Sequence, residues 1–200
     1  MNFSIEIGPA TDLESLPKLK DVYITLLPGG DFKETADQAK KLVKKGFNPI
    51  PHFPARSIEN EAQLKEYISR CRDGGTKQVL VIGGSREPIG DFDSSIQVLE
   101  TGYFENMKIG IAGHPEGSPD ISDSKLEKAM NDKKPYADYI VTQWLLDPQP
   151  ILDFISKQTV PVHVGITGHP EGSPDISDSE LEKAMNDKKP YADYIVTQWL

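Results

Sequence analysis

The sequence has almost no cysteine and no excess of positive charge. Cys71 is the only cysteine among 200 residues, so a disulfide framework and a thiolate metal site are both excluded. Acidic residues outnumber basic ones by 31 to 22, and the net charge is −9. Nucleic acid is therefore excluded as a partner, because phosphate binding requires a basic surface. The composition predicts a globular protein with a solvated acidic surface.

Long hydrophobic runs and a glycine-rich phosphate loop are also missing. No apolar run reaches the roughly 20 residues that span a bilayer, and the N-terminus MNFSIEIGPATD lacks the basic and apolar regions of a signal peptide. We therefore expect a cytoplasmic protein with no membrane partner. The first predicted strand is followed by Gly8-Pro9-Ala10-Thr11 rather than by G-x-G-x-x-G, which disfavours a doubly wound nucleotide-binding sheet.

A long internal repeat is present instead. Residues 110–145 recur at 165–200 and differ at two positions, where Ala112 and Lys125 of the first copy correspond to Thr167 and Glu180 of the second. Repeats under selection diverge further than this, because each copy meets different neighbours. We therefore interpret residues 1–164 as the functional portion of a barrel. The duplicate, residues 165–200, belongs to the same domain or is a passenger.

Short apolar runs alternate with longer amphipathic stretches, as in βα units. Several of the runs are continuous in Val and Ile, which is typical of buried parallel strands. This alternation predicts an α/β fold, a TIM-type (β/α)8 barrel that is incomplete because the repeat replaces its last units. The predicted strands are residues 3–7, 22–26, 49–53, 79–82, 109–112, 139–142 and 160–164, and the predicted helices are residues 33–45, 60–72, 92–101, 124–131 and 148–157.

Polar residues follow the predicted strands at the ends where barrel enzymes place their active sites. Glu6 lies in the first strand, Thr25 and His52 end the second and third, and Gln143 ends the sixth. A glutamate flanked by apolar residues on a buried strand favours an acid of raised pKa over a surface ion pair. His52 and Gln143 also fit ordinary strand ends, and the residues alone favour that interpretation.

Together these motifs resemble one family. The ordered set is Ser4-Ile5-Glu6-Ile7-Gly8-Pro9, Tyr23-Ile24-Thr25, Pro51-His52-Phe53, Ile82-Gly83-Gly84, the loop Ala112–Pro119 (AGHPEGSP) and Ile140-Val141-Thr142-Gln143-Trp144. It resembles methylenetetrahydrofolate reductase from the N-terminus to about Ile166. The A-G-x-P-E-G-x-P loop and the I-x-T-Q strand end are its most specific elements. The last strands and helices of that family's barrel are replaced here by the duplicate.

The resemblance implies an oxidoreductase, a flavoprotein of one-carbon metabolism and methionine biosynthesis. It would reduce 5,10-methylenetetrahydrofolate to 5-methyltetrahydrofolate with FAD and with NADH or NADPH as the electron donor. It makes Glu6 the general acid and Gln143 the folate-binding residue. The implied cofactor-binding residues are Thr25, His52, Gly83, Gly84, Ser85, Ala112, His114 and Ser118.

Departures from the family pattern leave two alternatives open. Ser85 stands near the place of the family's aspartate, while His114 and Ser118 replace its tyrosine and second histidine. The chain could then be a folate-binding barrel that has lost flavin, or a truncated inactive product. Association into a homo-oligomer is also left open. Acidic residues of the 113–123 loop fit turn and N-cap roles, so no metal site is expected.

Overall fold

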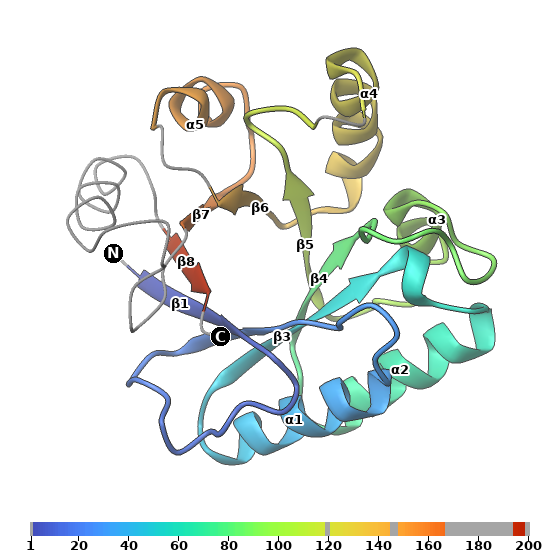
Figure 1. Cartoon of the computed structure of the whole chain (residues 1–200), viewed down its shortest axis with the longest axis vertical. Coiled ribbons are helices and arrows are strands. Elements are labelled where there is room, and N and C mark those ends of the chain that lie inside the picture. The colour runs from blue at the N-terminus through green and yellow to red at the C-terminus, as the bar shows by residue number, and fades with distance from the viewer. Residues whose placement is uncertain (1, 119–120, 145–147, 167–193, 199–200) are drawn as a thin grey trace.

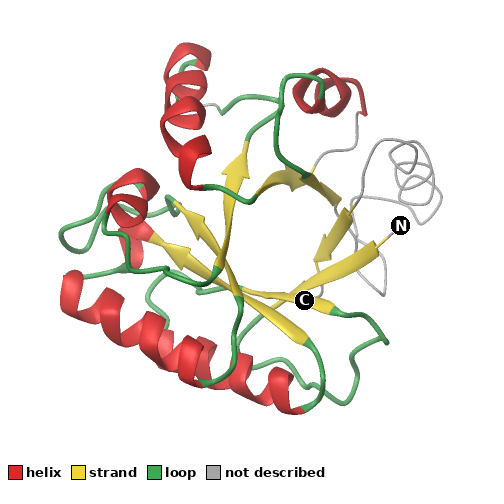
Figure 2. Cartoon of the chain, turned by 180° about the vertical axis from the view of Figure 1, so that it is seen from behind, coloured by secondary structure: helices red, strands yellow, loops and turns green. Residues whose placement is uncertain are grey.

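A computed structural model describes residues 2–118, 121–144, 148–166 and 194–198. Eight parallel strands form a closed barrel in the order β1-β2-β3-β4-β5-β6-β7-β8, and the helices lie outside it (Figures 1 and 2). The strands are β1 (Asn2–Ile7), β2 (Asp21–Ile24), β3 (Asn48–Pro54), β4 (Gln78–Ile82), β5 (Lys108–Gly113), β6 (Tyr139–Trp144), β7 (Val162–Ile166) and β8 (Tyr194–Gln198).

Five α-helices cover the outer surface of the described strands. They are α1 (Phe32–Lys44), α2 (Glu61–Asp73), α3 (Ser95–Glu100), α4 (Asp123–Lys133) and α5 (Pro148–Ile155), with 3₁₀ turns at η1 (Ala55–Ser57) and η2 (Lys134–Tyr136). Local capping explains where α1 and α2 begin. The Asp31 carboxylate accepts a hydrogen bond from the Lys33 amide at 2.9 Å, and the Asn60 side chain accepts one from the Gln63 amide at 2.9 Å, which satisfies free donors of each first turn.

The TIM-type architecture and all seven predicted strands are confirmed, and each strand boundary lies within two residues of its predicted position. The helical layer is incomplete at one described connection, because residues 8–20 join β1 to β2 without a helix. The strand layer closes through β8, which is drawn from the duplicated segment and pairs with both β7 and β1. The sequence that forms the sixth strand of the barrel therefore also forms its eighth strand.

The apolar core has an outer and an inner part, because successive side chains of a barrel strand point alternately outward and into the barrel. The outer part lies between strands and helices, and its largest cluster includes Phe53, Tyr67 and Leu64. The inner part consists of Tyr23, Ile50, Leu80, Tyr139 and Val141. Two tyrosines in the inner part place hydroxyl groups inside the barrel, where each requires a hydrogen-bond partner.

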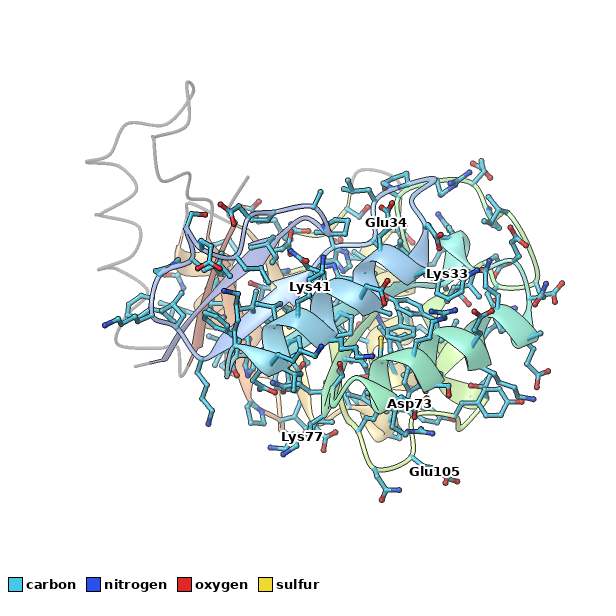
Figure 3. The ribbon with its side chains drawn as sticks, turned by 90° about the horizontal axis from the view of Figure 1, so that it is seen from below. Lys33, Glu34, Lys41, Asp73, Lys77 and Glu105 are labelled. Carbon is cyan, nitrogen blue, oxygen red and sulfur yellow. The ribbon has the colours of Figure 1, made fainter. Side chains whose placement is uncertain are left out.

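The outer faces of α1 and α2 carry side chains of both charges (Figure 3). Lys33, Glu34 and Lys41 project from α1, and Asp73 ends α2. Interspersed charges of both signs form a solvated surface. None of the described helices is long and apolar enough to cross a bilayer.

Candidate active site at the barrel mouth

The strand register groups the interior side chains into layers. In a (β/α)8 barrel each strand is offset from the last by about one residue, and each layer comes from alternate strands. Following the register from Glu6 across β2 and β3 places His52 in the layer of Glu6. Continuing through β4 and β5 adds Ala112 to this layer. Tyr23, Leu80 and Val141 then form the layer below, in agreement with the inner apolar cluster.

Glu6 and His52 face each other in this layer near the C-terminal ends of the strands. The Glu6 Oε2 atom lies 3.6 Å from His52 Nε2, and the two side chains are 25% and 8% exposed. This separation exceeds a normal hydrogen bond, and His52 Nε2 is buried with no hydrogen-bond partner among the described residues. An unsatisfied buried nitrogen beside a carboxyl group marks a place where a ligand or a proton can bind.

Burial changes the proton affinity of both groups. It raises the pKa of the Glu6 carboxyl above its ordinary value and lowers the pKa of His52 to about 4, because the charged form of each is poorly solvated. At neutral pH His52 is therefore a neutral imidazole, and the 3.6 Å contact is not an ion pair. The pair combines a carboxyl group that holds its proton to higher pH with a nitrogen that is free to accept one.

A second polar group lies beneath the pair. The Tyr23 hydroxyl and His163 Nδ1 are 2.8 Å apart, and the Tyr139 ring stacks on the His163 ring at 4.3 Å. The Tyr139 hydroxyl donates to the Val79 carbonyl oxygen at 3.2 Å. The Tyr23 ring also meets the His52 ring edge-on, with 6.1 Å between centroids. The floor of the mouth is thus built from aromatic rings whose polar atoms are paired.

Five of the residues predicted for the site converge on the mouth. Glu6, His52 and Ala112 share one layer, and Thr25 and Gln143 belong to the next layer toward the strand ends. The Thr25 hydroxyl donates to the Ile7 carbonyl oxygen at 3.3 Å. The backbone register sets position 198 of β8, rather than position 143, directly beside Glu6.

The other predicted site residues lie in loops and do not join the pair. Gly83, Gly84 and Ser85 follow β4. The Gly83 carbonyl oxygen accepts a hydrogen bond from the Arg56 amide at 3.0 Å. Gly84 adopts a φ of 93°, and the Ser85 side chain is exposed. His114 is half-buried after β5, and burial together with nearby Lys133 lowers its pKa. Ser118 forms a bridge with Ile121 in the same loop.

Tyr23, Tyr139 and His163 are the functional candidates that sequence reasoning missed. All three lie at strand positions whose alternation points them inward, and a polar ring at an inward position is the signal that could have identified them. Among the described residues, no cluster of three or more His, Cys, Asp or Glu side chains could hold a metal ion.

Comparison with known proteins supports the fold. No family model matches the chain. An oxaloacetate acetylhydrolase in complex with oxalate is 9% identical with a TM-score of 0.63, over 98% of this chain and 74% of that one. A 2,3-dimethylmalate lyase of the PEP mutase/isocitrate lyase superfamily has the same identity and score, over 98% and 75%. Tryptophan synthase from M. tuberculosis is 10% identical with a TM-score of 0.63, over 98% and 82%. These neighbours are enzymes, and at such identities they establish a shared TIM-barrel fold.

The assignment to methylenetetrahydrofolate reductase is wrong. The solved structures reported above are named as a lyase, a hydrolase and a synthase, not as flavin-dependent folate reductases. The predictions of flavin-mediated folate reduction and of a role in one-carbon metabolism or methionine biosynthesis rested on this assignment, so they are wrong as well. The motifs misled because Gly, Pro and polar residues at strand ends meet the turn requirements of many barrels. FAD, NADH or NADPH and a homo-oligomer stay predictions that these findings do not decide.

Proposed function

We propose that the chain is an enzyme that performs general acid–base chemistry at the barrel mouth. Its reaction would be a lyase or isomerase step on a small organic acid, with Glu6 and His52 as the reacting pair. The observation that supports this proposal is the distance of 3.6 Å between Glu6 Oε2 and His52 Nε2, a nitrogen that has no hydrogen-bond partner among the described residues. A positioned pair of this kind contributes about 10²- to 10⁴-fold to a proton-transfer reaction.

The two groups suit opposite ends of one proton transfer. For a β-hydroxy acid, His52 Nε2 takes the proton of the hydroxyl group, and the C–C bond then breaks to leave a carbonyl group. The bonding electron pair moves to the carbon next to the carboxylate, and Glu6 delivers a proton there from its protonated form, which burial favours by raising its pKa. The step is redox-neutral and its protons balance, so it requires no electron donor. The neutral state of His52 at pH 7 follows from its pKa of about 4.

The fold neighbours support small oxygenated acids as the compounds to test first. One is bound to oxalate, and another is named for 2,3-dimethylmalate. Those substrates belong to those proteins, and the fold alone carries none of them to this chain. They define a panel of C2 to C6 hydroxy- and oxo-acids in which a bond next to a carboxylate can be formed or broken.

The experiment is proton NMR of this panel in D₂O with the purified protein. Lyase chemistry gives new products, and isomerase chemistry or partial reaction gives deuterium at the carbon next to the carboxylate. We expect Glu6→Gln and His52→Gln each to reduce the rate by about 10²-fold or more. The control is Glu100→Gln, a change at an exposed carboxylate on α3. Full activity in both site variants would contradict the proposal.

A further inference from the structure

The buried ring cluster beneath the acid–base pair has no role in the proton transfer itself. Tyr23 is fully buried, and Tyr139 and His163 are 4% and 7% exposed. They come from β2, β6 and β7, which are separated by up to 140 positions in sequence. Burying polar rings together is costly unless their hydrogen bonds are made, so the arrangement calls for an explanation beyond packing.

The hydrogen bond between Tyr23 and His163 has a defined direction. Burial raises the pKa of the Tyr23 phenol well above its ordinary value, so the phenol keeps its proton. Burial also lowers the pKa of His163 to about 4, so this imidazole is neutral at pH 7. A neutral imidazole that accepts at Nδ1 carries its proton on Nε2. We therefore assign the Tyr23 hydroxyl as donor and His163 Nδ1 as acceptor.

Tyr23 connects this cluster to the pair above it. It lies on β2, between β1 with Glu6 and β3 with His52, and it is the register partner of Glu6. Its ring meets the His52 ring at an interplanar angle of 69°. The hydroxyl is held on the far side by His163, and the stacked Tyr139 ring at 17° keeps His163 from tilting. The orientation of the Tyr23 ring is therefore set at both ends.

We propose that Tyr23 is a positioning residue for the Glu6–His52 pair and that His163 on β7 is its anchor. This inference rests on the proposed function. The hydroxyl–imidazole bond holds the Tyr23 ring against the His52 ring, and so holds His52 Nε2 toward Glu6. Small displacements of a reacting group reduce rates steeply, so a ring that loses its anchor weakens catalysis although it touches no substrate.

The test compares Tyr23→Phe with Tyr139→Phe. The first keeps the ring beside His52 and removes the bond to His163. The second removes the Tyr139 hydroxyl, which bonds to Val79 and also interacts with the Tyr23 hydroxyl, and it leaves the bond between Tyr23 and His163 in place. We expect Tyr23→Phe to lower kcat about tenfold with little change in KM. We also expect the NMR titration of His52 to shift in Tyr23→Phe and to stay at the wild-type position in Tyr139→Phe.

Two variants of the anchor keep the inference testable if Tyr23→Phe fails to fold. His163→Asn offers an amide oxygen as an acceptor, while His163→Leu offers none. We expect the Asn variant to retain the wild-type His52 titration and the Leu variant to shift it. Equal titrations in both would overturn the proposal, as would a wild-type His52 titration in a folded Tyr23→Phe. If instead Glu6→Gln and His52→Gln stay active, the proposed function fails, and the NMR titrations still decide the positioning role.

Discussion

The Tyr67 hydroxyl on α2 donates a hydrogen bond to the main-chain carbonyl oxygen of His52 on β3, at 3.0 Å. The bond joins the helical layer to the strand position that carries one half of the acid–base pair. The Tyr67 ring also stacks on Phe53 with 4.0 Å between centroids. His52 is thus held from outside the barrel by Tyr67 and meets Tyr23 inside it.

Tyr67→Phe is expected to lower the free energy of unfolding by about 1 kcal/mol, the usual net value of a buried hydrogen bond. The stacking on Phe53 is retained, so the loss reports the hydroxyl group alone. Urea unfolding followed by circular dichroism measures it. Tyr136→Phe, at a tyrosine 38% exposed, is the control and should change stability by much less. Equal effects of the two variants would contradict the role assigned to the Tyr67 hydroxyl.

Stability should fall between pH 6.5 and about pH 4. His52 and His163 both have a pKa of about 4 in the folded chain, and near 6.5 when unfolded. In this interval the unfolded chain binds protons that the folded chain does not, so acid favours unfolding by up to about 3 kcal/mol per histidine. The raised pKa of Glu6 acts in the opposite direction, because the folded chain takes up that proton first.

Urea unfolding at a series of pH values between 7 and 4 measures this slope. His163→Asn should flatten it, because one of the two buried histidines is removed while an acceptor for Tyr23 remains. His114→Asn is the comparison at a half-buried position and should flatten it less. Equal slopes in the wild-type chain and in His163→Asn would show that His163 is not neutral in the folded chain.

The order of the first seven strands, and their bounds to within two residues, could be predicted from sequence, because each strand is a local apolar run. Glu6, Thr25 and His52 could be found in the same way, since they sit at or near strand ends. The pairing of Tyr23 with His163 could not. Alternation predicts which side chains face the barrel interior, but not which of them meet across 140 positions. Which side chains meet depends on the offsets between all neighbouring strands, added together around the barrel.

The structural role of the duplicated segment also could not be predicted from the local sequence pattern. The sequence shows that residues 165–200 repeat residues 110–145, and this alone does not decide whether a copy packs. In the structure β8 pairs with β1 from Asn2 to Glu6. The copy can close the barrel because its strand has the same residues, Tyr-Ile-Val-Thr-Gln, as β6. These residues are mostly β-branched or aromatic, and such residues favour strand structure at either position.

Gly110→Ala should destabilise the barrel. A Cβ atom at position 110 would lie 2.5 Å from the Tyr139 ring, which is held by stacking on His163, so the ring or β5 must shift. The expected cost is about 1 to 3 kcal/mol, as for other overpacked cores. Gly83→Ala is the matched control, because nothing lies within 4 Å of its added Cβ. Thermal unfolding compares the two, and an equal melting temperature would place the Tyr139 ring elsewhere.

Deletion of residues 167–200 should open the barrel. It removes β8, whose neighbours on both sides are parallel strands, and leaves β1 and β7 with unpaired edges. Exposed strand edges pair with other chains, so we expect lower stability together with concentration-dependent association.

Light scattering after size exclusion, combined with dye binding to exposed apolar surface, measures the effect of this deletion. A second variant keeps the full length and replaces Val196 by Asp. It should show the same association, because position 196 pairs with Ser4 of β1 and Gly165 of β7, and Asp is unfavourable in strands whereas Val is favourable. If the deletion variant stays monomeric and melts at the temperature of the full chain, β8 contributes nothing to closure and the duplicate is a passenger. If both variants associate, the second copy is a working part of the barrel, and the Glu6–His52 pair depends on it through β1.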